Sequence, residues 1–362
     1  MTANLERQAA LLAWYFAHAR AMPWRSLEGQ VDPYCVVVSE LMLQQTRVDT
    51  VKDYFVRWLA RWPDWPTLAA ADLDEVLAQW TGLGYYNRAR NLHRLAQVVV
   101  ADLGGRLPAD ADRLRALPGI GPYTAGAVAS IAFGQPVALV DGNVARVLSR
   151  WSLVHEEARV GAGSKAVWAL AQAALAAPGP ARSTPGHWNQ ALMELGAMVC
   201  TPRAAGCGHC PVAAWCEAKA AGLQNEIPAV RVRPQIVAVA AWHAIVCDGR
   251  GQVLLGRRPD RGRWAGLWEP PGAEGPGAAD AVVGWARRHG IALDSPLAPV
   301  IHVLTHRRYT ATPLPGRSAT QSVEVGSLGY TASRWATVGE VRAPTAGLSR
   351  LGQRLVAAVH GD

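Results

Sequence analysis

The pattern of hydrophobic and polar positions changes about two thirds of the way along the chain. Up to about residue 222, apolar residues recur at helical spacing in segments joined by short loops, which predicts an all-α region. The predicted helices cover residues 5–19, 34–62 with a break near 46–49, 73–80, 86–103, 111–117, 144–151, 166–176 and 189–200. From residue 236 the pattern becomes typical of strands, with a hairpin around the turn DGRG. The C-terminal third is therefore predicted to be a separate α+β domain.

One predicted helix carries a carboxylate among apolar residues. Asp32 and Pro33 form a typical helix start, an N-cap followed by proline at the first helical position. Glu40 lies in the middle of the apolar run that follows. Burial raises the pKa of a carboxyl group, and a glutamic acid that keeps its proton near neutral pH can act as a general acid. The alternative is a structural glutamate that pairs with an arginine or caps a neighbouring backbone.

A glycine-rich turn opens the stretch LPGIGPYTAGA at residues 117–127. Gly119 and Gly121 flank Ile120, and Pro122 stands at the first position of the next helix. Such a turn directs backbone N–H groups outward, which suits a phosphate of nucleic acid. An ordinary helix–turn–helix connection without a ligand is the alternative. The tripeptide DGN follows about twenty residues later and supplies a second carboxylate, Asp141.

Four cysteines lie close together near the end of the helical region. They are spaced C-x6-C-x2-C-x5-C, at Cys200, Cys207, Cys210 and Cys216. In a chain expected to be cytoplasmic, this spacing favours metal ligation over disulfides. The spacing alone leaves zinc and an iron–sulfur cluster open.

Composition limits the class of protein but adds little about its chemistry. Half of the 362 residues are hydrophobic, enough for a sizeable core. His18 and Arg20 interrupt the first apolar stretch, and no apolar run reaches membrane-spanning length, so we expect a cytoplasmic protein of the bacterial cytosol or nucleoid. The net charge is +8, and residues 231–362 contribute most of it, with 16 Lys and Arg against 9 Asp and Glu. Net charge alone is weak support for nucleic-acid binding.

Taken together, these motifs resemble the helix-hairpin-helix DNA glycosylases, and within them the MutY-type adenine glycosylases, over essentially the whole chain. The shared stretches are PWR at 23–25, SELMLQQT at 39–46, GLGYYNRARNLH at 82–93, LPGIGPYTAGA at 117–127, VDGNVARVLSR at 140–150, WNQALMELGAMVC at 188–200 and the four-cysteine loop. The resemblance implies a mainly α fold with an iron–sulfur cluster domain and a C-terminal α+β Nudix-like domain. It places a glycosylase domain at 1–222, with a six-helix barrel at 31–124 and the cluster domain at 1–30 and 125–222, then a linker at 223–235 and the Nudix-like domain at 236–362.

The resemblance also implies an activity, a monofunctional adenine DNA glycosylase of base excision repair. Its partner would be duplex DNA with adenine opposite 8-oxoguanine or guanine, bound by a monomer. Glu40 would protonate the flipped adenine at N7, and Asp141 would stabilise the oxocarbenium-like sugar. Tyr123 and Asn143 would orient Asp141 and the water. The implied substrate- and DNA-binding residues are Arg25, Gln45, Tyr85, Gly119, Gly121, Gln190, Thr305 and His306, and the four cysteines would hold one 4Fe-4S cluster.

Tyr123 decides a branch within this superfamily. Bifunctional relatives of the endonuclease III type carry a lysine at this position, whose amine forms a Schiff base and cuts the strand. This chain has no lysine between Lys52 and Lys165. We therefore expect base release without an efficient lyase step.

The C-terminal region resembles the Nudix-like module that senses 8-oxoguanine in this family. The stretch expected to hold the magnesium-binding glutamates reads AVVGWARRHG and has none, so nucleotide hydrolysis is not expected. Where the family usually has Phe-Ser-His, this chain has Leu304, Thr305 and His306. The hydroxyl and imidazole persist and the aromatic ring is lost; the alternative is a buried strand that contacts no base.

Two other functions compete with this interpretation. A mismatch glycosylase of the same superfamily would release thymine opposite guanine, but such relatives generally lack the C-terminal module. A nucleic-acid-binding protein with a degenerate site is the other candidate, and the intact pair Glu40 and Asp141 speaks against it.

Overall fold

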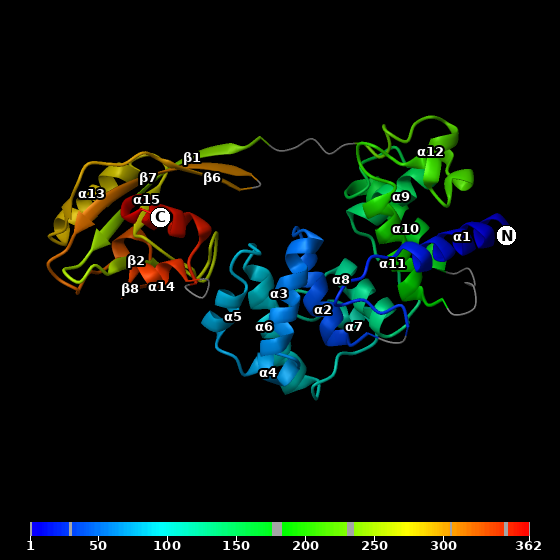
Figure 1. Cartoon of the computed structure of the whole chain (residues 1–362), viewed down its shortest axis with the longest axis horizontal. Helices are drawn as coiled ribbons and strands as arrows, with labels where there is room; N and C mark the ends of the chain where they lie inside the picture. Colours follow the sequence, from blue (N-terminus) through cyan, green and yellow to red (C-terminus); the bar gives the residue numbers. More distant parts are fainter. Residues whose placement is uncertain are drawn as a thin grey trace. The chain divides into compact units, whose positions relative to one another are not determined.

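The computed structural model describes residues 2–28, 31–175, 183–229, 235–304, 306–343 and 347–361 (Figure 1). The chain divides into two compact units, residues 1–70 with 91–232 and residues 71–90 with 233–362. The domain bounds expected from the sequence remain predictions. Among the described residues, every helix is too short or too polar to span a lipid bilayer.

The first unit is helical, as its periodicity predicts. Its helices are α1 (Thr2–His18), α2 (Pro33–Leu43), α3 (Val48–Arg61), α4 (Trp65–Ala69), the part of α6 (Asn87–Asp102) from residue 91, α7 (Ala111–Arg115), α8 (Pro122–Ala127), the π-helical turn η1 (Val128–Ala132), α9 (Gly142–Trp151), α10 (Gly161–Leu175), α11 (Pro185–Met198) and α12 (Glu217–Ala220). Two short 3-10 turns, Cys207–His209 and Ala213–Trp215, follow α11. Helix α5 (Leu73–Gln79) and the start of α6 belong to the second unit.

Local sequence sets the bounds of the helix that carries Glu40. The Asp32 carboxylate accepts a hydrogen bond of 2.7 Å from the backbone N–H of Tyr34, and Pro33 is the first helical residue of α2. The helix ends at Leu43 and α3 begins at Val48, which confirms the predicted break. Between them Gln45 adopts a left-handed backbone conformation with φ 58°.

A buried apolar cluster joins α1, α9, α10 and α11, which lie beside one another in Figure 1. Leu11, Tyr15, Leu148, Trp188 and Leu195 belong to this cluster, and each is at most 3% exposed. Burying these side chains stabilises the unit by the hydrophobic effect. The packing fixes the N-terminus of α9, where Asp141 lies, against α11.

The second unit is built on an eight-stranded sheet, which confirms the α+β prediction. Its strands are β1 (Val237–Cys247), β2 (Val253–Arg257), β3 (Trp268–Glu269), β4 (Gly272–Glu274), β5 (Ala292–Leu293), β6 (Val300–Leu304), β7 (Arg307–Arg317) and β8 (Ala332–Ala336). The order is β3-β2-β1-β7-β5, with β4 on β1, β6 on β7 and β8 on β2. The predicted hairpin is confirmed, because β1 and β2 pair antiparallel at Cys247 and Val253. Strands β1 and β7 pair in parallel.

Helices cover both faces of this sheet. Trp285 of α13 (Ala278–Arg288) packs in one buried cluster with Leu254 and Leu314. Leu355 of α15 (Arg350–His360) packs in another with Leu255 and Tyr309, and the short helix α14 (Val338–Arg342) adds Val341 to it. Leu254 and Leu255 are consecutive in β2, so the two clusters lie on opposite faces.

Candidate active site

A cavity of about 550 Å³ in the first unit brings together ionisable and amide side chains from segments far apart in the sequence. Helix α2 supplies Glu40, α8 supplies Tyr123, and α11 supplies Gln190 and Glu194. The remaining polar lining comes from the segment after α1, the turn after α2 and the start of α9, and includes Arg20, Arg25, Gln45, Asp141 and Asn143. This cavity is the candidate active site.

Glu40 is buried, as its place in an apolar helix predicts. It is 6% exposed, and its Oε2 accepts a hydrogen bond of 2.6 Å from the hydroxyl of Tyr123. Burial raises the pKa of Glu40 to about 7, and the negative charge of Asp141 adds to the rise. The Tyr123 hydrogen bond and the charge of Arg25 act in the opposite direction. Glu40 therefore holds a proton over a pH range in which an exposed glutamate is ionised.

Asp141 is held as the N-cap of α9. One carboxylate oxygen accepts from the backbone N–H groups of Asn143 at 2.9 Å and Val144 at 2.7 Å, and the other accepts from Asn143 Nδ2 at 2.9 Å. Burial raises the pKa of Asp141, while these hydrogen bonds lower it. The three donors and the positive end of the helix fix the carboxylate in one orientation.

The predicted orienting residues divide between the two carboxylates. Asn143 contacts Asp141, as expected. Tyr123 differs from the expectation, because its hydroxyl donates to Glu40 and not to Asp141. The reason is geometric: a phenol has one proton to donate, and the oxygen of Glu40 lies at 2.6 Å.

Arg146 connects this site with the cysteine-rich segment, and sequence reasoning did not single it out. Its Nη2 donates to Asn143 Oδ1 at 2.9 Å and to the Gly196 carbonyl at 2.6 Å, and its Nε donates to the Cys200 carbonyl at 2.6 Å. The available signal was its spacing, because residue 146 lies one helical turn beyond Asn143.

Arg20 and Glu194 were also missed. Glu194 is 1% exposed and forms ion pairs with Arg20 at 2.7 Å and Arg25 at 3.0 Å. The signal for Glu194 resembled that for Glu40, a single carboxylate in a mostly apolar helix. Its partners could not be named from the sequence, because Arg20 is 174 positions away.

The structure brings seven of the predicted residues to one cavity and places others outside its lining. The seven are Arg25, Glu40, Gln45, Tyr123, Asp141, Asn143 and Gln190. Gly119 has φ 76° in the turn before α8, and Gly121 is the N-cap of that helix. Two other predicted residues belong to the second unit. Tyr85 is 48% exposed and has φ 49°, and His306 is an exposed residue between β6 and β7. Thr305 lies outside the described residues.

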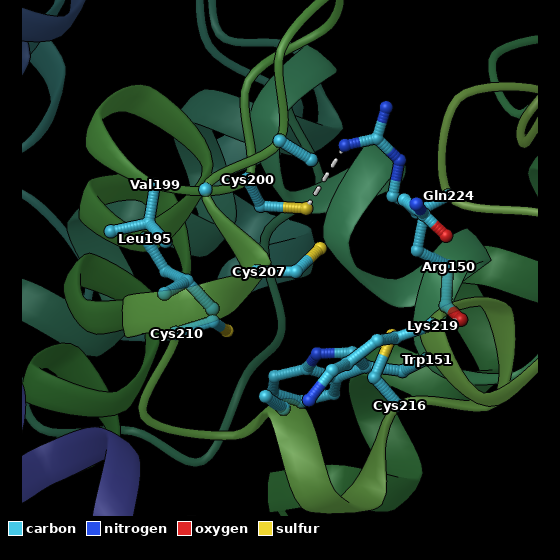
Figure 2. A pocket seen from close by; sticks show the side chains of 13 residues that line it. Arg150, Trp151, Leu195, Val199, Cys200, Cys207, Cys210, Cys216, Lys219 and Gln224 are labelled. Carbon is cyan, nitrogen blue, oxygen red and sulfur yellow. Dashed lines mark hydrogen bonds between the residues drawn. The ribbon is translucent and has the colours of Figure 1, made fainter. Parts of the chain in front are cut away.

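The four cysteines line a second cavity in the first unit. Figure 2 shows Cys200, Cys207, Cys210 and Cys216 around a shared space, with Arg150 beside them. Arg150 Nη1 donates to the sulfur of Cys200 at 3.2 Å. Across the described ranges, no three His, Cys, Asp or Glu side chains converge closely enough to hold a single metal ion. Four sulfurs around a space, with a cationic donor to one of them, fit the thiolate ligands of a cluster of several atoms.

Comparison with known proteins identifies the family. Residues 38–171 match the model of the HhH-GPD superfamily base excision DNA repair proteins, and residues 241–358 match the NUDIX domain. The adenine DNA glycosylase of Mycolicibacterium smegmatis is 42% identical over 223 residues, which are 62% of this chain and 73% of that protein. The chain belongs to the adenine DNA glycosylase family. This confirms the family resemblance that the motifs predict.

The adenine DNA glycosylases also include longer proteins than this chain. That of Mus musculus is 41% identical over 309 residues, which cover 72% of this chain and 59% of the mouse protein. The chain thus spans about three fifths of the length of this curated relative. A solved thermostable thymine-DNA glycosylase is 27% identical, with a TM-score of 0.52 over 61% of this chain and 98% of that one. The helix-hairpin-helix glycosylase fold predicted for the N-terminal region is confirmed.

Proposed function

We propose that this chain is a monofunctional adenine DNA glycosylase that hydrolyses the N-glycosidic bond of adenine opposite 8-oxoguanine or guanine in duplex DNA. One observation carries the proposal: two carboxyl groups with different environments, Glu40 and Asp141, line one cavity. Burial raises the pKa of both groups, that of Glu40 to about 7, and at Asp141 three hydrogen bonds to the carboxylate act against the rise. The pair suits acid catalysis by one group and charge stabilisation by the other.

Glu40 is the general acid of the proposed reaction. Its Oε2 accepts from Tyr123, so the acid proton lies on Oε1, from which it passes to N7 of a flipped adenine. Protonation turns the base into a neutral leaving group and weakens the bond to the sugar. Gln190 of α11 and Arg25, which line the same cavity, are proposed to contact the edge of the base.

Asp141 stabilises the positive charge that develops on the sugar as adenine leaves. Its orientation is set before the substrate binds, because the start of α9 supplies two backbone donors. Asn143 holds the second carboxylate oxygen and is proposed to orient the water that completes hydrolysis.

The position of Tyr123 argues for base release without strand cleavage. A lyase step needs an amine that attacks the sugar to form a Schiff base. The residue at this position is a phenol that is hydrogen-bonded to Glu40, and no lysine is among the described residues that line the cavity.

We propose that Cys200, Cys207, Cys210 and Cys216 hold one 4Fe-4S cluster. The cluster, when bound, would cross-link the loop after α11 through its iron–thiolate bonds. Arg150 stabilises negative charge on the Cys200 sulfur and donates to the Thr201 carbonyl at 2.9 Å, which ties the loop to α9. Visible charge-transfer absorption lost on Cys210→Ser, but not on Cys247→Ser, would support this assignment; a colourless folded protein would contradict it.

Residues outside the cavity are proposed to bind the DNA. The turn at Gly119 and Gly121 precedes α8 and suits a phosphate. Tyr85 is half exposed and strained, which suits a side chain that wedges between bases. Thr305 and His306 are proposed to read 8-oxoguanine opposite the adenine. Gln45, which lines the cavity, is proposed to fill the space around the extruded base. The protein is proposed to act as a monomer.

Single-turnover base release tests the function. Three duplexes would carry adenine opposite 8-oxoguanine, adenine opposite guanine, and thymine opposite guanine, each analysed with and without alkali. We expect cleavage of the adenine strand only after alkali, fastest opposite 8-oxoguanine. Release of thymine would contradict the proposed substrate, and cleavage without alkali would contradict the monofunctional assignment.

A variant separates an enzyme from a binding protein with a degenerate site. Glu40→Gln removes the acid proton and keeps the shape of the side chain. We expect base release to be lost and binding to the adenine duplex to be retained. An unchanged rate would contradict the role of Glu40.

A further inference from the structure

The candidate active site contains a third carboxylate, Glu194, which the proposed chemistry does not use. It accepts hydrogen bonds from the backbone N–H of Arg20 at 3.0 Å, from Arg20 Nε at 2.7 Å and Nη2 at 3.0 Å, and from Arg25 Nη2 at 3.0 Å. Burial alone would raise the pKa of Glu194, but these hydrogen bonds and the charge of Arg25 lower it to about 2. Glu194 is therefore ionised over the whole pH range in which Glu40 titrates.

Arg25 is held rigidly by this carboxylate. Its side chain is 8% exposed, its Nη1 donates to the Arg20 carbonyl at 3.1 Å, and its guanidinium lies 5.6 Å from the ring centre of Tyr15. Both terminal nitrogens thus bind protein groups, and the buried Nε has no hydrogen-bond partner among the described residues. A buried guanidinium held in this way keeps its charge at a fixed place in the cavity wall.

The charge of Arg25 acts against the protonated state of Glu40, because it favours the ionised carboxyl. The ionisable groups that line the cavity with Glu40 are Arg20, Arg25, Tyr123, Asp141 and Glu194. Asp141 raises the pKa of Glu40, and the Tyr123 hydrogen bond lowers it. Glu194 contacts both arginines, so its negative charge offsets the positive charge of Arg25 in the wall of the cavity that Glu40 also lines.

We propose that Glu194 is a positioning residue that fixes Arg25 in the cavity wall and neutralises its charge, so that Glu40 keeps its proton at neutral pH. The inference rests on the proposed role of Glu40 as the general acid. Two carboxyl groups of one cavity thus keep different protonation states: Glu194 stays ionised, and Glu40 stays protonated.

The pH dependence of single-turnover adenine release tests this inference. In the parent protein, release should fall as Glu40 ionises near pH 7. Glu194→Gln leaves the charge of Arg25 uncompensated, and this positive charge favours the ionised form of Glu40. We call the part of the pH profile in which release decreases its falling limb. In Glu194→Gln we expect this limb to move to lower pH by about one unit, and in Glu194→Asp we expect it to lie where it does in the parent protein.

Two further variants separate charge from structure. Combining Glu194→Gln with Arg25→Gln removes both members of the ion pair, and the falling limb should return toward its original pH even if the rate is lower. Arg20→Gln removes a partly exposed cation that shares Glu194 with Arg25, so more of the Glu194 charge compensates Arg25 and the limb should move to higher pH. Because Arg20→Gln changes a side chain that is 38% exposed, it provides a readout even if Glu194→Gln does not fold.

Glu156→Gln is the matched control, because Glu156 is exposed and does not line the cavity. A folded Glu194→Gln protein whose falling limb stays in place would overturn the inference, and so would an Arg20→Gln limb that moves to lower pH. Failure of the proposed function would look different, since the parent protein would then release no adenine at any pH.

Discussion

The hydroxyl of Tyr123 donates a hydrogen bond of 2.6 Å to Oε2 of Glu40, and the two residues are 83 positions apart in the sequence. The bond orients the buried carboxyl group and lowers its pKa against the rise that burial causes. Burial also raises the pKa of Tyr123 well above its usual value, so the phenol stays protonated and remains the donor. The geometry of the candidate acid therefore depends on α8 as well as on α2.

Replacing Tyr123 by phenylalanine should move the pH profile of adenine release. The variant loses a hydrogen bond that favours ionised Glu40, so the pKa of Glu40 rises and the falling limb moves to higher pH by about one unit. The profile is measured by single-turnover kinetics. A limb that stays in place or moves to lower pH would show that Tyr123 does not act on Glu40.

Asp141→Asn should remove the charge at the sugar while leaving the fold intact. We expect base release to fall about 10²- to 10³-fold, because a preorganised charge is lost. Asparagine caps helices about as well as aspartate, so the melting temperature should change little. Asp110→Asn is the control, since Asp110 caps α7 in the same way, accepting from Arg113 N at 2.9 Å, and should not affect the rate. Equal rates for the two variants would contradict the role of Asp141.

Arg146→Gln should affect stability and activity together. It removes the donors to Asn143 Oδ1 and to the carbonyls of Gly196 and Cys200. Leaving such acceptors unpaired costs about 1–3 kcal/mol in the free energy of unfolding, and base release should slow because Asn143 loses its support. Arg94→Gln, an exposed arginine on α6, is the control for the lost charge. Denaturant unfolding measures the loss of stability, and single-turnover kinetics measures the slower base release. A variant with the stability and the rate of the parent protein would contradict the role of Arg146.

Gly119→Ala should destabilise the turn before α8. Gly119 has φ 76°, and an added Cβ would lie 2.6 Å from Cβ of Asn91. The backbone strain alone is of order 1–3 kcal/mol. At Gly121, φ is −87° and an added Cβ meets no atom within 4 Å, so Gly121→Ala should change stability by about 0.5 kcal/mol or less. Thermal unfolding of the Gly119→Ala and Gly121→Ala variants tests the expected difference in stability. Equal melting temperatures would show that the turn tolerates a side chain at residue 119.

Much of the local structure follows from the sequence alone. Apolar periodicity placed the longer helices of the first unit, Asp32 and Pro33 marked the start of α2, and the strand-like segment at 236–248 contains β1. The burial of Glu40 was also predictable, because the helix around it is apolar on nearly every side. These features depend on residues within one or two turns of each other, and side-chain periodicity and helix caps encode them directly.

The tertiary structure decided which groups meet. Three of the contacts each join residues at least 54 positions apart in the sequence. They are Glu194 with Arg20, Glu40 with Tyr123, and Arg146 with the Cys200 carbonyl. The sequence shows each of these residues but not its partner, because ion pairs and hydrogen bonds are set by how the helices pack. The opposite pKa shifts of Glu40 and Glu194 have the same origin. Burial raises the pKa of both carboxyl groups, and it is the packing of two arginines against Glu194 that keeps this group ionised while Glu40 holds its proton.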